Sequence, residues 1–151
     1  KGLGGGVPIG AMLARGECAT VFGPGDHAST YGGNPLATGA GLAIAQAFTD
    51  EELLKNVNDR SSQLVEGLNN LKKKYPNVIK DVRGWGLLLG VELSDSVSAT
   101  AGDVVGKAME KGLLLVGAGK KVVRFVPRLN VEEGEISQCL SMFEEAIAAF
   151  A

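Results

Sequence analysis

A long series of leucines at helical spacing constrains the fold of this chain more than any other feature. The apolar positions on this face are Leu53, Leu54, Val57, Leu64, Leu68 and Leu71. Their periodicity predicts an amphipathic helix that ends near the Tyr75-Pro76 pair, where proline cannot continue it. Thr49 and the acidic residues 50–52 resemble a cap with an acidic first turn in front of this helix. The helix is the element that joins the first half of the chain to the second.

Strand and helix signals alternate after this helix. Residues 81–93 read DVRGWGLLLGVEL, a β-type apolar run that glycines interrupt. The segments that follow are a loop at 94–102, a helix at 103–111 stopped by Gly112, two short strands within 113–119 and 121–129, and a closing amphipathic helix at 131–150. This alternation predicts a small α/β unit.

The part before the long helix is predicted to be mostly loop as far as residue 34. Within it, Ala19–Phe22 is a candidate strand. Asn34 is a good N-cap and Pro35 suits a first helical position, so we expect a helix over residues 36–48. The small side chains of this helix would let another backbone pack closely. They favour a buried position, in the interior or at a subunit interface.

The composition is that of a soluble globular protein. The 151 residues are 45% hydrophobic and 21% charged with a net charge of -2, which fits one domain or parts of two. This balance excludes the disordered class and gives no sign of a nucleic-acid partner. The basic cluster Lys72–Lys74 is interpreted as a solvated helix end. No apolar run reaches the roughly 18–20 residues of a membrane span.

The cysteines indicate the redox compartment of the protein, and the first residues indicate how much of the polypeptide is present. Cys18 and Cys139 are far apart and form no C-x-x-C pair, which predicts no metal site and favours a reducing compartment. The chain opens on Lys1, with neither a signal peptide nor a start methionine. We expect it to be the later part of a longer polypeptide.

Glycine makes up four of the first six residues, directly after Lys1. Glycine is costly to order unless the backbone needs positive φ or another group comes very close. The lysine precedes the glycines, so this is not a Walker phosphate loop. GPGDHA at residues 23–28 fits a loose dinucleotide pattern, but Asp26 would stand where the pyrophosphate belongs. An amine beside bare backbone could form a Schiff base with a carbonyl group, although an exposed loop lysine is the commoner case.

Two further stretches could bind anions. In GDHASTYGGNPLA, the hydroxyls of Ser29 and Thr30 precede a pair of glycines and a helix start, which makes an anion cradle; the alternative is a plain turn that caps the helix. In VVRFVPRL, Arg124 stands in an apolar strand and must either face solvent or be paired, for example with a ligand carboxylate. Arg128 would face the same side only if Pro127 leaves the strand regular.

These stretches, taken in order, resemble the class III pyridoxal-phosphate-dependent aminotransferases, and among them the acetylornithine aminotransferases most closely. KGLGGGVPIGAML is similar to the family segment that begins with the Schiff-base lysine, GDHASTYGGNPLATGAGLA to its phosphate-binding segment, and VVRFVPRL to its arginine strand. RGWGLLLGVEL is similar to the strand that opens the family's C-terminal small domain. The likeness covers essentially the whole chain.

The resemblance implies a fold and a set of site residues. The fold is α/β, the fold type I of PLP-dependent aminotransferases, with residues 1–76 as the end of the large domain and its connecting helix and residues 77–151 as the small domain. Lys1 would be the catalytic lysine that carries pyridoxal 5'-phosphate. Thr30, with Ser29 beside it, would bind the cofactor phosphate of the neighbouring subunit, and Arg124 would receive a substrate carboxylate. No metal is implied.

The implied reaction is transamination between N-acetylornithine and 2-oxoglutarate in arginine biosynthesis, by a cytoplasmic homodimer with shared active sites, or in a plastid or mitochondrion of a eukaryote. Alternative amine donors are ornithine, succinylornithine and 4-aminobutyrate. A non-catalytic fragment that keeps the fold is the alternative from another class. The family's remaining cofactor residues lie before the lysine, so activity is expected only in a complete chain.

Overall fold

The computed structural model describes residues 2–50 and 52–151. By its internal contacts the chain divides into two units, Lys1–Glu52 and Leu53–Ala151, and each unit is described by itself. The long helix groups with the second unit. The predicted domain boundary between residues 76 and 77 concerns a complete enzyme and stays a prediction.

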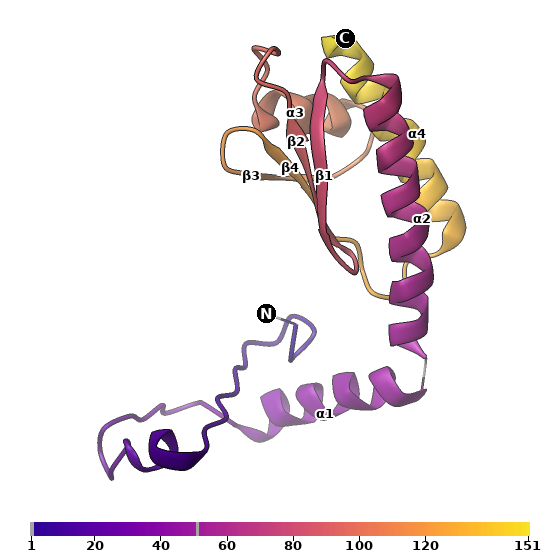
Figure 1. Ribbon diagram of the computed structural model, residues 1–151. Coiled ribbons are helices and arrows are strands. Elements are labelled where there is room, and N and C mark those ends of the chain that lie inside the picture. The colour runs from indigo at the N-terminus through magenta and orange to yellow at the C-terminus, as the bar shows by residue number, and fades with distance from the viewer. Residues whose placement is uncertain (1, 51) are drawn as a thin grey trace. The chain divides into compact units, whose positions relative to one another are not determined.

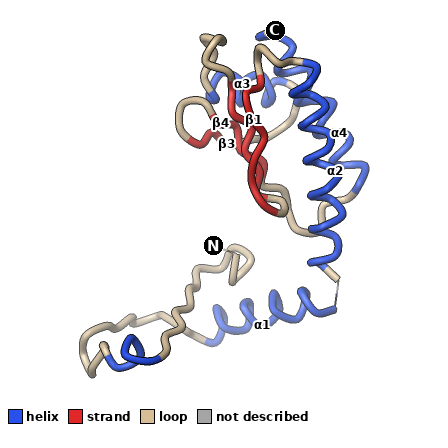
Figure 2. The backbone as a smooth tube through the Cα atoms, in the orientation of Figure 1, coloured by secondary structure: helices blue, strands red, loops and turns tan. Residues whose placement is uncertain are grey.

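The second unit is built on a four-stranded antiparallel sheet with strand order β1-β2-β4-β3. Figure 2 shows these strands in red with helices packed beside them. In chain order the elements are α2 (Leu53–Lys74), β1 (Ile79–Trp85), β2 (Leu88–Leu93), α3 (Ala101–Glu110), β3 (Val116–Ala118), β4 (Val122–Phe125), α4 (Glu133–Ile147) and the short 3-10 helix η2 (Ala148–Phe150).

One face of this sheet is covered by the three α-helices (Figure 1). Helix α2 packs on β1, helix α3 packs on β3 and β4, and α4 contacts both of these helices. The strands meet them with alternate residues, since Leu89, Val91 and Leu93 of β2 are all buried whereas the residues between them are less so. The period of two expected of a half-covered strand is therefore present.

The core joins α2, the sheet and α4 in one cluster. Leu64 and Leu68 of α2 are fully buried in it. Phe125 of β4 meets Phe143 of α4 edge to face, with ring centroids 4.9 Å apart. Replacing a fully buried leucine by alanine costs about 2–5 kcal/mol. The leucine face of α2 is therefore a main source of stability. The interpretation of residues 53–75 as an amphipathic helix is confirmed.

Glycine permits the tight hairpin between β1 and β2. Gly84 has φ +143°, and a Cβ there would lie 2.1 Å from the carbonyl oxygen of Leu88 and 2.8 Å from the Cα of Leu89. Gly86, in the loop, has φ +57°. Both positions adopt backbone conformations that other residues rarely take.

The first unit contains η1 (Gly16–Thr20) and α1 (Pro35–Asp50). The Oδ1 of Asn34 accepts a hydrogen bond from the amide of Ala37 at 3.1 Å, so the predicted N-cap is confirmed. The glycine-rich segment packs on α1, where a Cβ at Gly5 would lie 2.8 Å from the Cδ1 of Ile44. Close approach therefore accounts for at least part of that glycine run.

Two predictions for this region are wrong. Ala19–Phe22 is not a strand, because Gly16–Thr20 forms a 3-10 helix in which the Thr20 hydroxyl donates to the Glu17 carbonyl. Thr49 does not cap α2, because α1 continues through it to Asp50. The expected burial of α1, in the interior or at a subunit interface, concerns a complete protein and stays a prediction.

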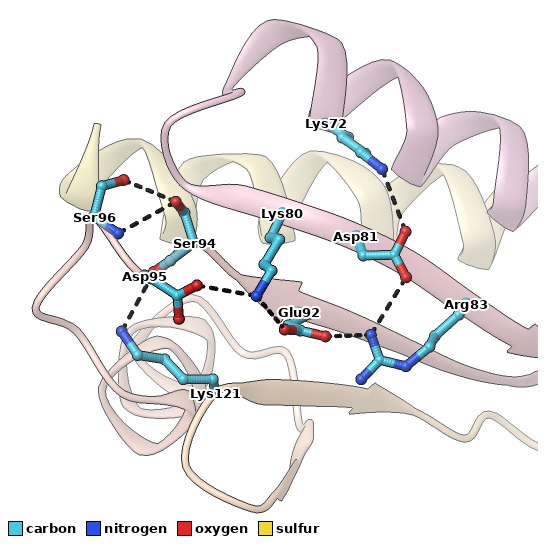
Figure 3. Close-up of polar contacts among 9 residues, drawn as sticks. All are labelled: Lys72, Lys80, Asp81, Arg83, Glu92, Ser94, Asp95, Ser96 and Lys121. Atoms are coloured by element: carbon cyan, nitrogen blue, oxygen red, sulfur yellow. Dashed lines mark hydrogen bonds and ion pairs between the residues drawn. The ribbon is translucent and has the colours of Figure 1, made fainter.

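A network of ion pairs ties the outer edge of the sheet to α2 and to the loop after β2 (Figure 3). Glu92 lies between Lys80, at 3.1 Å, and Arg83. Lys80 also contacts Asp95 at 2.9 Å. Asp81 joins Arg83 to Lys72 of α2, at 3.3 Å from each. The predicted solvated end of α2 is thus basic and partly ion-paired.

In the part of the chain that the structure describes, no helix is both long enough and apolar enough to cross a membrane.

The hairpin geometry predicts that Gly84→Ala destabilises the protein. The added Cβ meets backbone atoms on β2, which cannot rotate away, so we expect a loss of about 3 kcal/mol from overlap and strain together. The matched control is Gly106→Ala in α3, where a Cβ meets nothing within 4 Å. That variant should be slightly stabilising. Urea unfolding of the purified variants measures both, and equal midpoints would contradict the role given to Gly84.

The ion-pair network predicts a loss of stability in acid. Lys80 and then Arg83 lower the pKa of Glu92, and hydrogen bonding to Lys80 lowers the pKa of Asp95. A pKa that is lower in the folded state stabilises above the unfolded value, and this contribution disappears as the pH falls through the folded value. Unfolding midpoints should therefore fall below about pH 4.5, and the fall should be smaller in Glu92→Gln. Glu66→Gln, an exposed site on α2, is the control for loss of one carboxylate.

Candidate functional site

The face of the sheet opposite the helices carries Arg124. The neighbours of Arg124 in β4, Val123 and Phe125, are buried in the core, so strand alternation directs Arg124 to the open face. Its side chain is exposed. Among the described residues it has no hydrogen bond or ion pair. Of the two alternatives left by the sequence, solvent exposure is therefore the one observed within this chain.

The strand register places Arg124 in a row across the sheet. Gly90 of β2 pairs with Arg124 on one side and with Arg83 of β1 on the other. On its remaining side Arg124 pairs with Val116 of β3. Gly90 thus separates two arginines, and its missing side chain leaves the sheet surface between them bare.

An open hollow occupies this part of the sheet. Its lining includes Arg83, Trp85, Leu88, Gly90, Val122 and Arg124. The indole of Trp85 is 93% exposed and Leu88 is 55% exposed. A guanidinium beside apolar surface suits a ligand that presents a carboxylate next to a carbon chain, because the planar group binds both carboxylate oxygens.

The two arginines on this face are in different electrostatic states. Arg83 is paired with Glu92 and, at 3.3 Å, with Asp81, which raises the pKa of its guanidinium further. Arg124 has no such partner among residues 2–50 and 52–151. Of the two, Arg124 is therefore the one available to an incoming anion.

Arg128 does not join this face as a second anion-binding group. Its Nη2 lies 2.7 Å from both carboxylate oxygens of Glu135, in the first turn of α4. This ion pair links the segment after β4 to the first turn of α4. Strand β4 ends at Phe125, before Pro127, so the two arginines of VVRFVPRL do not lie in one strand and have different surroundings.

The loop before α1 places Ser29 and Thr30 side by side but uses them differently. The Ser29 hydroxyl oxygen accepts a hydrogen bond from the amide of Gly32 at 2.9 Å, which is the plain turn left open as an alternative. Thr30 is exposed, and its hydroxyl has no hydrogen bond to the described residues. Gly33, with φ +68°, then leads into the Asn34 cap. A free hydroxyl ahead of a helix N-terminus is a donor set that fits a phosphate oxygen.

In the dinucleotide-like segment 23–28, a side chain of the protein already binds an amide that a phosphate would need. The carboxylate of Asp26 accepts a hydrogen bond from the amide of Gly23 at 2.6 Å. A nucleotide phosphate would need that donor and would meet a negative charge there. This arrangement agrees with the prediction that the segment is not a Rossmann site.

The predicted site residues fall into separate parts of the structure. Lys1 lies outside the described residues. Ser29 and Thr30 belong to the first unit and Arg124 belongs to the second, and each unit is described by itself. Their shared role in one site stays a prediction.

Sequence reasoning missed Arg83 and Gly90 as neighbours of Arg124. The alternation of Asp81, Arg83 and Trp85 in β1 already places these residues on one face. What the sequence lacks is the register, because Gly90 and Arg124 are separated by a loop, a helix and another strand.

Comparisons with known proteins agree on a family. The family described as Aminotransferase class-III matches residues 1–147. An acetylornithine aminotransferase of Thermosynechococcus vestitus is 56% identical over 151 residues, which are 100% of this chain and 36% of that protein. The chain therefore spans about a third of the length of such relatives.

Solved structures give the same result. The N-acetylornithine aminotransferase of Stenotrophomonas maltophilia superposes with a TM-score of 0.83 at 38% identity, over 98% of this chain and 38% of the other. The ornithine aminotransferase of Toxoplasma gondii, described with partial occupancy of PLP at its active site, superposes with a TM-score of 0.81 at 30% identity, over 91% and 32%. The predicted fold class is confirmed, and the chain belongs to the class-III aminotransferases.

Proposed function

We propose that the polypeptide containing this chain transfers an amino group between N-acetylornithine and 2-oxoglutarate, as a step of arginine biosynthesis. The observation that carries the proposal is the 56% identity to an acetylornithine aminotransferase over the whole of this chain. The guanidinium of Arg124, which has no partner among the described residues, supports it, because both substrates present carboxylates to be held.

Pyridoxal 5'-phosphate is the proposed cofactor, and when bound it would supply an electron sink for the substrate carbon that bears the reacting amine. Lys1 would hold it through its ε-amine and would then move the proton of that carbon as general acid and base. The Thr30 hydroxyl, with Ser29 shaping the turn, would donate to the phosphate. The Thr30 hydroxyl, which has no hydrogen bond to the described residues, and the helix that starts after it are the features that support this role.

Arg124 is proposed to bind a substrate carboxylate through its two terminal nitrogens. A charge-assisted pair of this kind fixes the orientation of the substrate as well as its position. Orientation matters here because a transaminase selects the bond to break by the angle at which that bond meets the cofactor ring.

The assembly is proposed to be a homodimer in which Thr30 of one subunit completes the phosphate site of the other. Residues 1–76 then belong to the large domain and residues 77–151 to the small domain. The proposed compartment is the cytoplasm, or a plastid or mitochondrion in a eukaryote.

A second candidate donor is ornithine, which the likeness to the Toxoplasma gondii ornithine aminotransferase favours. Succinylornithine and 4-aminobutyrate are further donors compatible with the same lysine chemistry. Steady-state kinetics of the full-length enzyme with each donor would separate these alternatives. If kcat/KM for N-acetylornithine were the lowest among the four donors, the proposal would be overturned. A non-catalytic fold, the rival from another class, would give no turnover with any donor.

The role of Lys1 predicts a spectroscopic result. The full-length enzyme should show an absorbance band near the visible edge that borohydride shifts, because borohydride reduces the imine between lysine and cofactor to a stable amine that survives denaturation. In Lys1→Ala no cofactor should remain attached to the denatured protein after reduction, because a cofactor bound without the imine is reduced to a free alcohol. The matched control is Lys120→Ala, an exposed lysine in the turn between β3 and β4, which should behave as wild type. Cofactor that remains attached to denatured Lys1→Ala after reduction would refute the assignment.

The role of Arg124 predicts a binding defect. In Arg124→Met the KM for 2-oxoglutarate should rise by about thirtyfold or more, corresponding to the loss of about 2 kcal/mol from a charge pair. Arg128→Met is the control, because that arginine is held by Glu135 and not by substrate. A KM that rises equally in both variants, or in neither, would contradict the role of Arg124.

A further inference from the structure

Glu92 is placed where it could compete with a substrate for Arg124. Glu92 lies on the open face of β2, two residues from Gly90, and Gly90 pairs with Arg124. Glu92 itself pairs with Val122, so it is the diagonal neighbour of Arg124 across the two strands. Diagonal Cβ atoms are about 7–8 Å apart or slightly less, a gap that long side chains can bridge. A free glutamate here could form an ion pair with Arg124.

The structure shows Glu92 held in another direction. Figure 3 shows its carboxylate between the ammonium of Lys80 and the guanidinium of Arg83. Arg83 is anchored in turn by Asp81 at 3.3 Å, and Asp81 by Lys72 of α2. The position of the Glu92 carboxylate is therefore set by β1 and, through it, by a helix on the far side of the sheet.

The negative charge of Glu92 matters for ligand binding at Arg124. Hydrogen bonds from Lys80 and then Arg83 lower the pKa of Glu92, so the group is an anion at neutral pH. An anion released beside an unpaired guanidinium would be bound without any loss of translational freedom. A substrate carboxylate has to give up that freedom to bind, and so it would compete at a disadvantage.

We propose that Arg83 is a positioning residue that, together with Lys80, holds Glu92 away from Arg124 and so keeps that guanidinium free for the substrate carboxylate. Gly90 completes the arrangement by leaving no side chain between the two arginines. The inference rests on the proposed role of Arg124. It adds a specificity role for residues that touch neither substrate nor cofactor.

Two variants that break the same ion pair distinguish this role from a merely structural one. Arg83→Met leaves a charged Glu92 next to Arg124, whereas Glu92→Gln leaves no competing charge. If the pair only stabilises the sheet, the two variants should affect the full-length enzyme alike. If it keeps Arg124 free, only Arg83→Met should impair substrate binding.

The experiment is the KM for 2-oxoglutarate in the full-length enzyme, measured for Arg83→Met, Glu92→Gln and the double variant. We expect about a tenfold rise in Arg83→Met with little change in kcat, which corresponds to one competing ion pair. Glu92→Gln should match wild type, and adding it to Arg83→Met should restore the wild-type KM. Arg83→Lys, which keeps a cation next to Glu92, should rescue in part. If Arg83→Met does not fold, Lys80→Met replaces it, with a rise in KM that Glu92→Gln again removes.

Equal KM values in the two single variants, or failure of the double variant to restore KM, would overturn the inference. Arg124→Met separates this failure from that of the proposed function. If Arg124→Met raises KM while Arg83→Met does not, Arg124 keeps its role and only the positioning role is lost. If Arg124→Met leaves KM unchanged, the carboxylate role and the inference fall together.

Discussion

The antiparallel pairing of β2 with β4 is the constraint on which the rest of the second unit depends. Leu89 pairs with Phe125 and Val91 with Val123, and all four side chains are buried under the helices. Because successive side chains of a strand point to opposite faces, this burial sends Gly90 and Arg124 to the other face together. A register shift by one residue would bury the arginine and expose the core. The free energy of packing thus fixes the position of a polar group that contributes nothing to that packing.

Two glycines contribute to this arrangement because they have no side chain. At Gly84 the missing Cβ lets β1 approach β2 so closely that any side chain would meet backbone. At Gly90 the missing side chain leaves bare surface between Arg83 and Arg124, although a Cβ there would lie 3.0 Å from the Cγ1 of Val122. One glycine serves the fold and the other leaves room at the candidate site, although both belong to the same hairpin.

The electrostatics of the open face depend on neighbours rather than on residue type. Arg83 and Arg124 are the same amino acid on the same face, but Arg83 has two carboxylates within ion-pair distance and Arg124 has none among the described residues. Exposed ion pairs of this kind contribute little to stability one by one. Their arrangement decides which guanidinium is available to a ligand. In this sense the network around Glu92 is better understood as setting local charge than as holding the sheet together.

The sequence by itself determined what depends on local spacing. The leucine period of α2, the Asn34-Pro35 start of α1, the stop at Gly112 and the arginine in an apolar strand were all readable, because caps, turns and helix periods involve residues a few positions apart. Local signals failed at Ala19–Phe22, a short apolar run that pairs with no strand of the described residues, and at Thr49, where a cap residue continues a helix. The roles of Lys1, Ser29 and Thr30 stay predictions.

Only the tertiary structure decided which face Arg124 occupies, that Arg83 is paired whereas Arg124 has no partner among the described residues, and that Glu92 is the diagonal neighbour of Arg124. These facts follow from strand register, which is set by burying side chains from β2 and β4 in one core. The two strands are far apart in the chain, so no local pattern carries their alignment.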